Sequence, residues 1–122
     1  MGYRIDFAVR EDTVAAIVSG RTSSEAAAGW IADDIAETAR REAGKHVLID
    51  LRRLENRVGS LGALLVTREG RAPAERVAVV DLRENDPYYV FRELAARDRG
   101  CELRYFDDAG AALRWLRGEK QD

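Results

Sequence analysis

Three aspartates follow apolar runs that are typical of buried strands. Asp50 lies in HVLIDL, Asp81 in RVAVVDL, and Asp107 directly follows CELRYF. If these runs form parallel strands, their carboxyl ends meet at the sheet edge where open α/β folds bind ligands. Converging carboxylates there would suit Mg²⁺ and a small metal-dependent enzyme. Aspartate at a strand end is also a common turn former, and no phosphate-binding glycine loop accompanies the three. We therefore expect no metal and no cofactor.

A thiol and an imidazole form the second candidate for chemistry. His46 and Cys101 are the chain's single histidine and single cysteine, and each begins a predicted strand. A Cys–His nucleophile pair also needs an orienting group and an oxyanion hole, and the sequence offers neither. We therefore expect no catalytic residue and no enzymatic activity. A lone cysteine cannot form an internal disulfide, which fits a cytoplasmic protein.

A serine at a predicted helix start is the third candidate. Ser60 opens a predicted short helix over 60–69, where free N–H groups and the helix dipole favour a phosphate on the side chain. The same position suits serine as a simple N-cap. Arg52, Arg53 and Arg57 precede it in the loop and are candidate contacts for a phosphate or a partner.

The composition limits the classes of function. The chain has 122 residues, with 20 basic and 22 acidic side chains and a net charge of −2, which fits one domain over 1–122. The arginines are spread along the chain, so we expect no nucleic-acid binding. The apolar runs are far shorter than the ~20 residues that span a bilayer, so we expect no membrane span.

The pattern of apolar residues predicts the elements that hold these side chains. Residues 3–9 alternate in polarity, as in a strand with one wet face, and 13–19 form its hairpin partner. Thr22 and Glu25 predict a capping box for a helix that ends near Gly44. The apolar runs from 46 and 76 predict parallel strands covered on both faces. Further elements are a helix over 60–69, a helix from Asp86 to Gly100, a strand over 101–106 and a helix capped by Asp108.

This order, ββαβαβαβα, carries two recognisable segments. HVLIDLRRLENRVGSLGALLVTREG, at the centre, resembles a STAS domain, the fold of the bacterial anti-sigma-factor antagonists. CELRYFDDAGAALRWLRG is similar to the end of stand-alone SpoIIAA-like proteins. The resemblance implies an α/β fold whose mixed sheet has an antiparallel first hairpin followed by parallel βαβ units.

The resemblance also implies a site and a kind of function. In the antagonists a serine at the start of the short helix is phosphorylated by a partner kinase, and that position falls on or beside Ser60. Val58 and Gly59 stand where an acidic and a small polar residue would be expected, so the SpoIIAA-like branch fits better than the partner-switching one. That branch is related in fold to the lipid-carrying CRAL-TRIO domains, which implies an apolar ligand as a second kind of partner.

We therefore expect a non-enzymatic regulatory or binding module that contacts a protein partner or a hydrophobic small molecule. The alternative is a small metal-dependent enzyme that uses Asp50, Asp81 and Asp107. We also expect a homodimer, because an open sheet has exposed strand edges and because aromatic residues flank the predicted helices. The aromatic residues are Trp30, Tyr88, Tyr89, Phe91 and Trp115.

Overall fold

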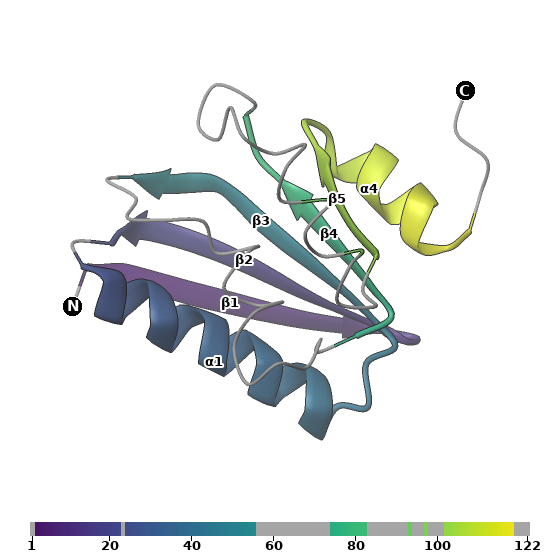
Figure 1. Ribbon diagram of the computed structural model, residues 1–122, viewed down its shortest axis with the longest axis horizontal. Helices are drawn as coiled ribbons and strands as arrows, with labels where there is room; N and C mark the ends of the chain where they lie inside the picture. The colour runs from purple at the N-terminus through teal and green to yellow at the C-terminus, as the bar shows by residue number, and fades with distance from the viewer. Residues whose placement is uncertain are drawn as a thin grey trace.

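Five strands in sequential order form one mixed sheet (Figure 1). The computed structural model describes residues 2–22, 24–55, 74–82, 93, 97 and 102–118. The first two strands pair antiparallel and every later neighbour pairs parallel, which confirms the predicted mixed sheet. The elements are β1 (Tyr3–Arg10), β2 (Thr13–Arg21), α1 (Glu25–Arg41), β3 (His46–Glu55), β4 (Arg76–Val80), β5 (Glu102–Phe106) and α4 (Ala109–Leu116).

The predicted helix over 60–69 lies outside the described residues, and of the predicted helix from Asp86 to Gly100 only Glu93 and Arg97 are described. Neither of the two helices that the structure describes is long and apolar enough to cross a membrane.

The central strands β3 and β4 are apolar on both faces, as their sequences predict. Val47 and Ile49 of β3 join a core with α1, whereas Leu48 between them joins a core with α4. Because successive strand residues point to opposite faces, the two helices cover opposite faces of the sheet. The α1 side buries Ala28, Ile31, Ala32, Ile35, Ala39, Val77 and Val79, and the α4 side buries Ala78, Val80, Ala112, Trp115 and Leu116.

The edge strand β1 differs from its prediction. Its alternating sequence predicts one buried face, but only the first half of that face is covered: Tyr3 and Ile5 pack against the α1-side core. Phe7 and Val9 continue the same face and are 39% and 46% exposed. The core cluster around α1 includes neither side chain, so the apolar face of β1 runs beyond what the helix covers.

The cap of α1 also differs from its prediction. Ser24 is the N-cap, and its hydroxyl accepts a hydrogen bond from the Ala27 N–H at 3.1 Å. Thr22 is buried instead, and its N–H donates to the carbonyl of Glu55. The chain thus stays extended alongside the end of β3 for longer than the capping-box pattern indicates. The Asp108 cap is confirmed, since its carboxylate accepts from the Ala111 N–H at 2.8 Å.

The end of α1 places an alanine where glycine is usual. The helix ends at Arg41, and Ala43 adopts a left-handed φ of 52°. Gly44, the predicted stop, serves another purpose: a Cβ there would lie 2.7 Å from Cγ2 of Val14. Glycine is therefore needed at position 44 for close packing against Val14, and Ala43 adopts the left-handed conformation instead.

This division of roles predicts opposite effects for two substitutions. Ala43→Gly removes the cost of a left-handed alanine and should raise the free energy of unfolding by about 0.5–1 kcal/mol. Gly44→Ala should lower it, because the new methyl group meets Val14. Urea unfolding of both variants measures the difference, and a stabilised Gly44→Ala would contradict this account.

Candidate functional site

The end of β3 extends past its parallel neighbour. β4 ends at Val80, opposite Asp50, while β3 continues to Glu55 and pairs there with β2. The exposed face of this extension carries Arg52 and Arg53. The predicted site residues Asp50, Arg52 and Arg53 therefore lie where the buried sheet gives way to solvent.

A β-bulge shapes this extension. Ile17 of β2 pairs with Asp50, but Ser19 pairs with Arg53, so β3 has one more residue than β2 between these pairs. Leu51 and Leu54 both join the α1-side core, although residues three apart in a regular strand would face opposite ways. The bulge thus keeps both leucines buried and leaves two consecutive exposed arginines between them.

Asp50 fixes the first of these arginines. Its Oδ1 accepts from Nε of Arg52 at 3.0 Å and its Oδ2 accepts from Nη2 at 2.7 Å, a two-pronged charge-assisted contact. Oδ1 also accepts from the Arg52 backbone N–H at 3.1 Å, the turn that an aspartate makes with the residue two places on. The carboxylate is buried, while 40% of the Arg52 side chain is exposed, so a buried anion orients a partly exposed cation.

The electrostatics of the pair follow from this geometry. Burial alone would raise the pKa of Asp50, but the hydrogen bonds from Arg52 and the positive charges of Arg52 and Arg53 outweigh it and lower the pKa below its usual value. The hydrogen bond to Asp50 raises the pKa of Arg52, to which the charge of Asp108 also contributes. Asp108 therefore has two effects: it caps α4, and its negative charge acts on Arg52.

The other strand-end aspartates do not join this contact. Asp81 is buried, and its Oδ1 accepts from the N–H of Leu82 at 2.8 Å, the turn-forming role. Asp107 is exposed. Among the described residues, which include all three aspartates, no three His, Cys, Asp or Glu side chains gather closely enough to hold a metal ion.

The remaining predicted site residues are only partly placed. Ser60, Arg57 and Cys101 lie outside the described residues. His46 is half-buried, and its Nδ1 is buried without a hydrogen-bond partner within the described part of the chain.

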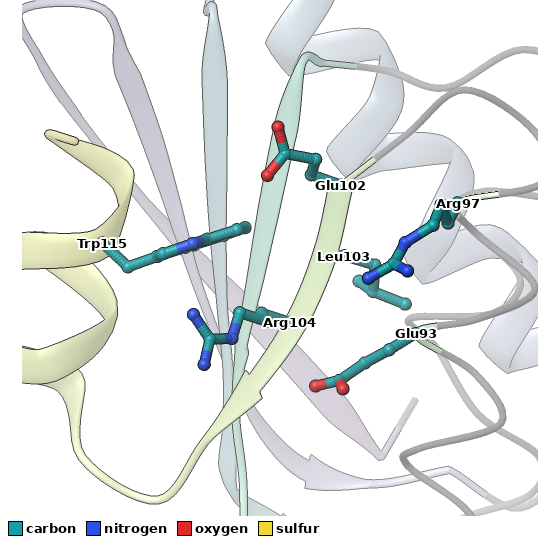
Figure 2. A pocket seen from close by; sticks show the side chains of 6 residues that line it. All are labelled: Glu93, Arg97, Glu102, Leu103, Arg104 and Trp115. Atoms are coloured by element: carbon teal, nitrogen blue, oxygen red, sulfur yellow. The ribbon is translucent and has the colours of Figure 1, made fainter. Parts of the chain in front are cut away.

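A pocket of about 360 Å³ lies beside β5 (Figure 2). Trp115 and Arg104 lie on one side of the strand and Glu93 and Arg97 on the other. Its wall consists of Glu93, Arg97, Glu102, Leu103, Arg104 and Trp115.

Most of the lining side chains of this pocket already serve the fold. Glu93 accepts from the backbone N–H of Tyr105 at 2.8 Å, and the Arg104 guanidinium lies 6.0 Å from the Trp115 ring centroid. The Arg76 guanidinium lies 5.3 Å from the centroid of the same ring and donates to the Trp115 carbonyl. Four of the six lining residues are charged, which does not suit the apolar ligand expected from the sequence.

The Asp50–Arg52 contact predicts a loss of stability when it is broken. Arg52→Ala leaves a buried carboxylate with a single backbone hydrogen bond and should cost about 1–3 kcal/mol. Arg40→Ala is the matched control, because Arg40 and Glu37 are both more than half exposed and such pairs contribute at most about 1 kcal/mol. If urea unfolding shows the same loss of stability for Arg52→Ala and Arg40→Ala, the Asp50–Arg52 contact does not stabilise the fold as described.

The lowered pKa of Asp50 predicts a pH dependence. A carboxyl whose folded pKa lies below its unfolded value stabilises the fold above the unfolded pKa, and that stabilisation is lost as the pH falls through the folded pKa. The stability difference between wild type and Asp50→Asn should therefore be largest near neutrality and shrink below about pH 4. A difference that stays constant through unfolding titrations in acid would contradict this.

Comparison of the chain with known proteins identifies its fold. No protein-family model and no curated protein matches the chain. Solved structures do match, and two of them cover 94% of this chain and 94% of their own chains. An uncharacterized protein with a SpoIIAA-like fold from Shewanella loihica PV-4 matches with a TM-score of 0.58 and 20% identity. An anti-sigma factor antagonist from Mycobacterium paratuberculosis matches with a TM-score of 0.60 and 18% identity. The chain has the SpoIIAA-like fold that its sequence predicts.

Proposed function

We propose that this protein is a non-enzymatic regulatory module that binds an acidic surface of another protein through the bulged end of β3. The observation that carries the proposal is the arginine pair, Arg52 and Arg53, which the bulge leaves exposed between two buried leucines. Bulges commonly occur where a strand redirects side chains toward a functional surface.

The chemistry of Arg52 supports a protein contact. Arginine loses side-chain freedom when it binds a partner, and Asp50 has already restricted this one. The guanidinium group has five N–H donors, and Asp50 accepts from two of its nitrogens, so it can also donate to a carboxylate of a partner. The SpoIIAA-like fold, shared with a protein described as an anti-sigma factor antagonist, supports the same class of function.

A catalytic role has less support. The Asp50 carboxylate, which would be the first ligand of a strand-end metal site, is occupied by Arg52. Two of the charged residues that line the described pocket already have partners within the chain: Glu93 accepts from the Tyr105 N–H, and Arg104 lies over the Trp115 ring.

Ser60 is the proposed control point of this surface. It follows Arg52, Arg53 and Arg57 in the sequence, and a phosphate on it would add a charge of roughly −1.5 to −2. Such a phosphate would compete with the acidic partner for the same guanidinium groups. Phosphorylation should therefore release the partner.

Affinity capture from extracts of the native cell tests the surface. Wild type and Arg40→Glu, the control on α1, should retain the same protein, whereas Arg53→Glu should lose it at least tenfold. No ion pair among the described residues involves Arg53, and the folding of the variant is checked by urea unfolding. Equal recovery with folded Arg53→Glu and wild type would contradict the proposal.

Ser60 variants test the control point separately. Ser60→Asp should reduce recovery of the partner, and Ser60→Ala should bind like the unphosphorylated wild type. Loss of an N-cap costs about 1 kcal/mol and leaves binding unchanged. Equal recovery with both variants, together with no phosphate on Ser60 by mass spectrometry, would reduce Ser60 to a cap.

A further inference from the structure

The two edges of the sheet present different backbone surfaces. At one edge, the N–H of Tyr105 in β5 is bound by the Glu93 carboxylate at 2.8 Å. At the other edge lies β1, which pairs only with β2 among the described strands. Unpaired backbone groups along a strand edge are a template for a further strand unless a charge, a bulge or a covering segment blocks them.

The hydrogen-bonding pattern of the hairpin identifies the outward groups of β1. Arg21 N–H donates to the carbonyl of Gly2, so this pair is hydrogen-bonded, and such pairs alternate along an antiparallel ladder. The even-numbered residues of β1 thus bond to β2. The backbone groups of Tyr3, Ile5, Phe7 and Val9 point away from the sheet.

Many side chains of β1 are also exposed to solvent and are not covered by the rest of the chain. Phe7 and Val9 are large apolar side chains exposed on one face. The other face carries charges of alternating sign, Arg4, Asp6 and Arg10, all exposed. The contact between Arg4 and Asp6 at 2.9 Å lies in solvent, so it leaves Asp6 accessible to a second cation.

We propose that two copies of this chain pair through β1, antiparallel, about a two-fold axis at Ala8. This register sets Phe7 opposite Val9 of the second copy and Asp6 opposite its Arg10. The two small Ala8 side chains meet in the closely spaced, non-hydrogen-bonded position. Phe7 and Val9, whose backbone groups face outward, form the hydrogen-bonded pairs.

Other registers of the two β1 strands either oppose like charges or leave exposed apolar residues uncovered. An axis at Asp6 sets the two Asp6 carboxylates against each other, and an axis at Phe7 sets Arg4 against Arg10; like charges directly opposite destabilise a strand pair. An axis at Ile5 pairs Arg4 with Asp6 but leaves Val9 and Arg10 without a partner. The axis at Ala8 alone combines paired charges with coverage of both exposed apolar residues.

The dimer joins two five-stranded sheets into one continuous sheet and, by symmetry, places both α1 helices on the same face. The bulged end of β3 is two strands away from the joined edge. This inference therefore does not rest on the proposed function, and either can fail without the other.

Charge reversal across the two-fold axis tests the register. Sedimentation velocity of wild type at tens of micromolar should show a dimer. Asp6→Arg alone and Arg10→Asp alone each create two like-charge pairs and should weaken dimerisation at least tenfold. An equimolar mixture of the two variants restores opposite charges at both positions and should recover the dimer as a heterodimer. Recovery on mixing also shows that both variants are folded.

Two further variants complete the test. Ala8→Lys sets two cations opposite each other on the axis and should give a monomer, whereas Arg40→Asp on α1 is the control and should leave the dimer intact. A monomeric wild type overturns the inference. So does a dimer that survives Ala8→Lys, or one that Arg10→Asp leaves unchanged, because either would place the interface elsewhere or in another register.

Discussion

Burial of β3 and β4 on both faces is the constraint on which this structure depends. A strand between two helices has no access to water, so its side chains must be apolar and its backbone must bond to neighbours on both sides. The sequential parallel order places β2 and β5 on those two sides. The antiparallel hairpin and the two helices can then be understood as the layers that remove β3 and β4 from solvent.

The candidate site forms where that burial ends. Asp50 is opposite the last residue of β4 and still buried, so its charge needs a partner within the chain. The bulge in β3 brings the N–H and the guanidinium of Arg52 to the same carboxylate. A requirement of stability, the pairing of a buried charge, thus also positions an exposed arginine.

Much of this could be predicted from the sequence, and the errors have physical causes. The continuous apolar runs predicted the parallel strands, and Asp108 was recognised as a cap because its side chain acts locally. The Thr22 cap was wrong because pairing with Glu55, distant in sequence, keeps the chain extended to Thr22. The left-handed residue fell on Ala43 because Gly44 is needed beside Val14. Neither long-range contact has a local pattern.

The sequence singled out Asp50, Arg52 and Arg53 as candidates but did not indicate how they contact one another. Asp50 was grouped with two other carboxylates, whereas its contact is with Arg52. The sequence did carry a signal, since Leu51 and Leu54 are three apart in a segment where a strand requires an even spacing. That spacing predicts a bulge and, with it, two outward arginines. The roles of Ser60 and Arg57 and the helix from Asp86 to Gly100 remain predictions.

The carboxylate of Glu93 on the edge of β5 has a consequence for assembly. A sheet that is open at both edges can add copies without limit and grow into a fibre, because each added molecule presents the same template again. With the Tyr105 N–H occupied, addition at β5 must first displace the Glu93 side chain. In the proposed dimer, growth at β1 is self-terminating, since each copy uses the same edge that it offers. One glutamate thus favours closed point-group symmetry over filament formation.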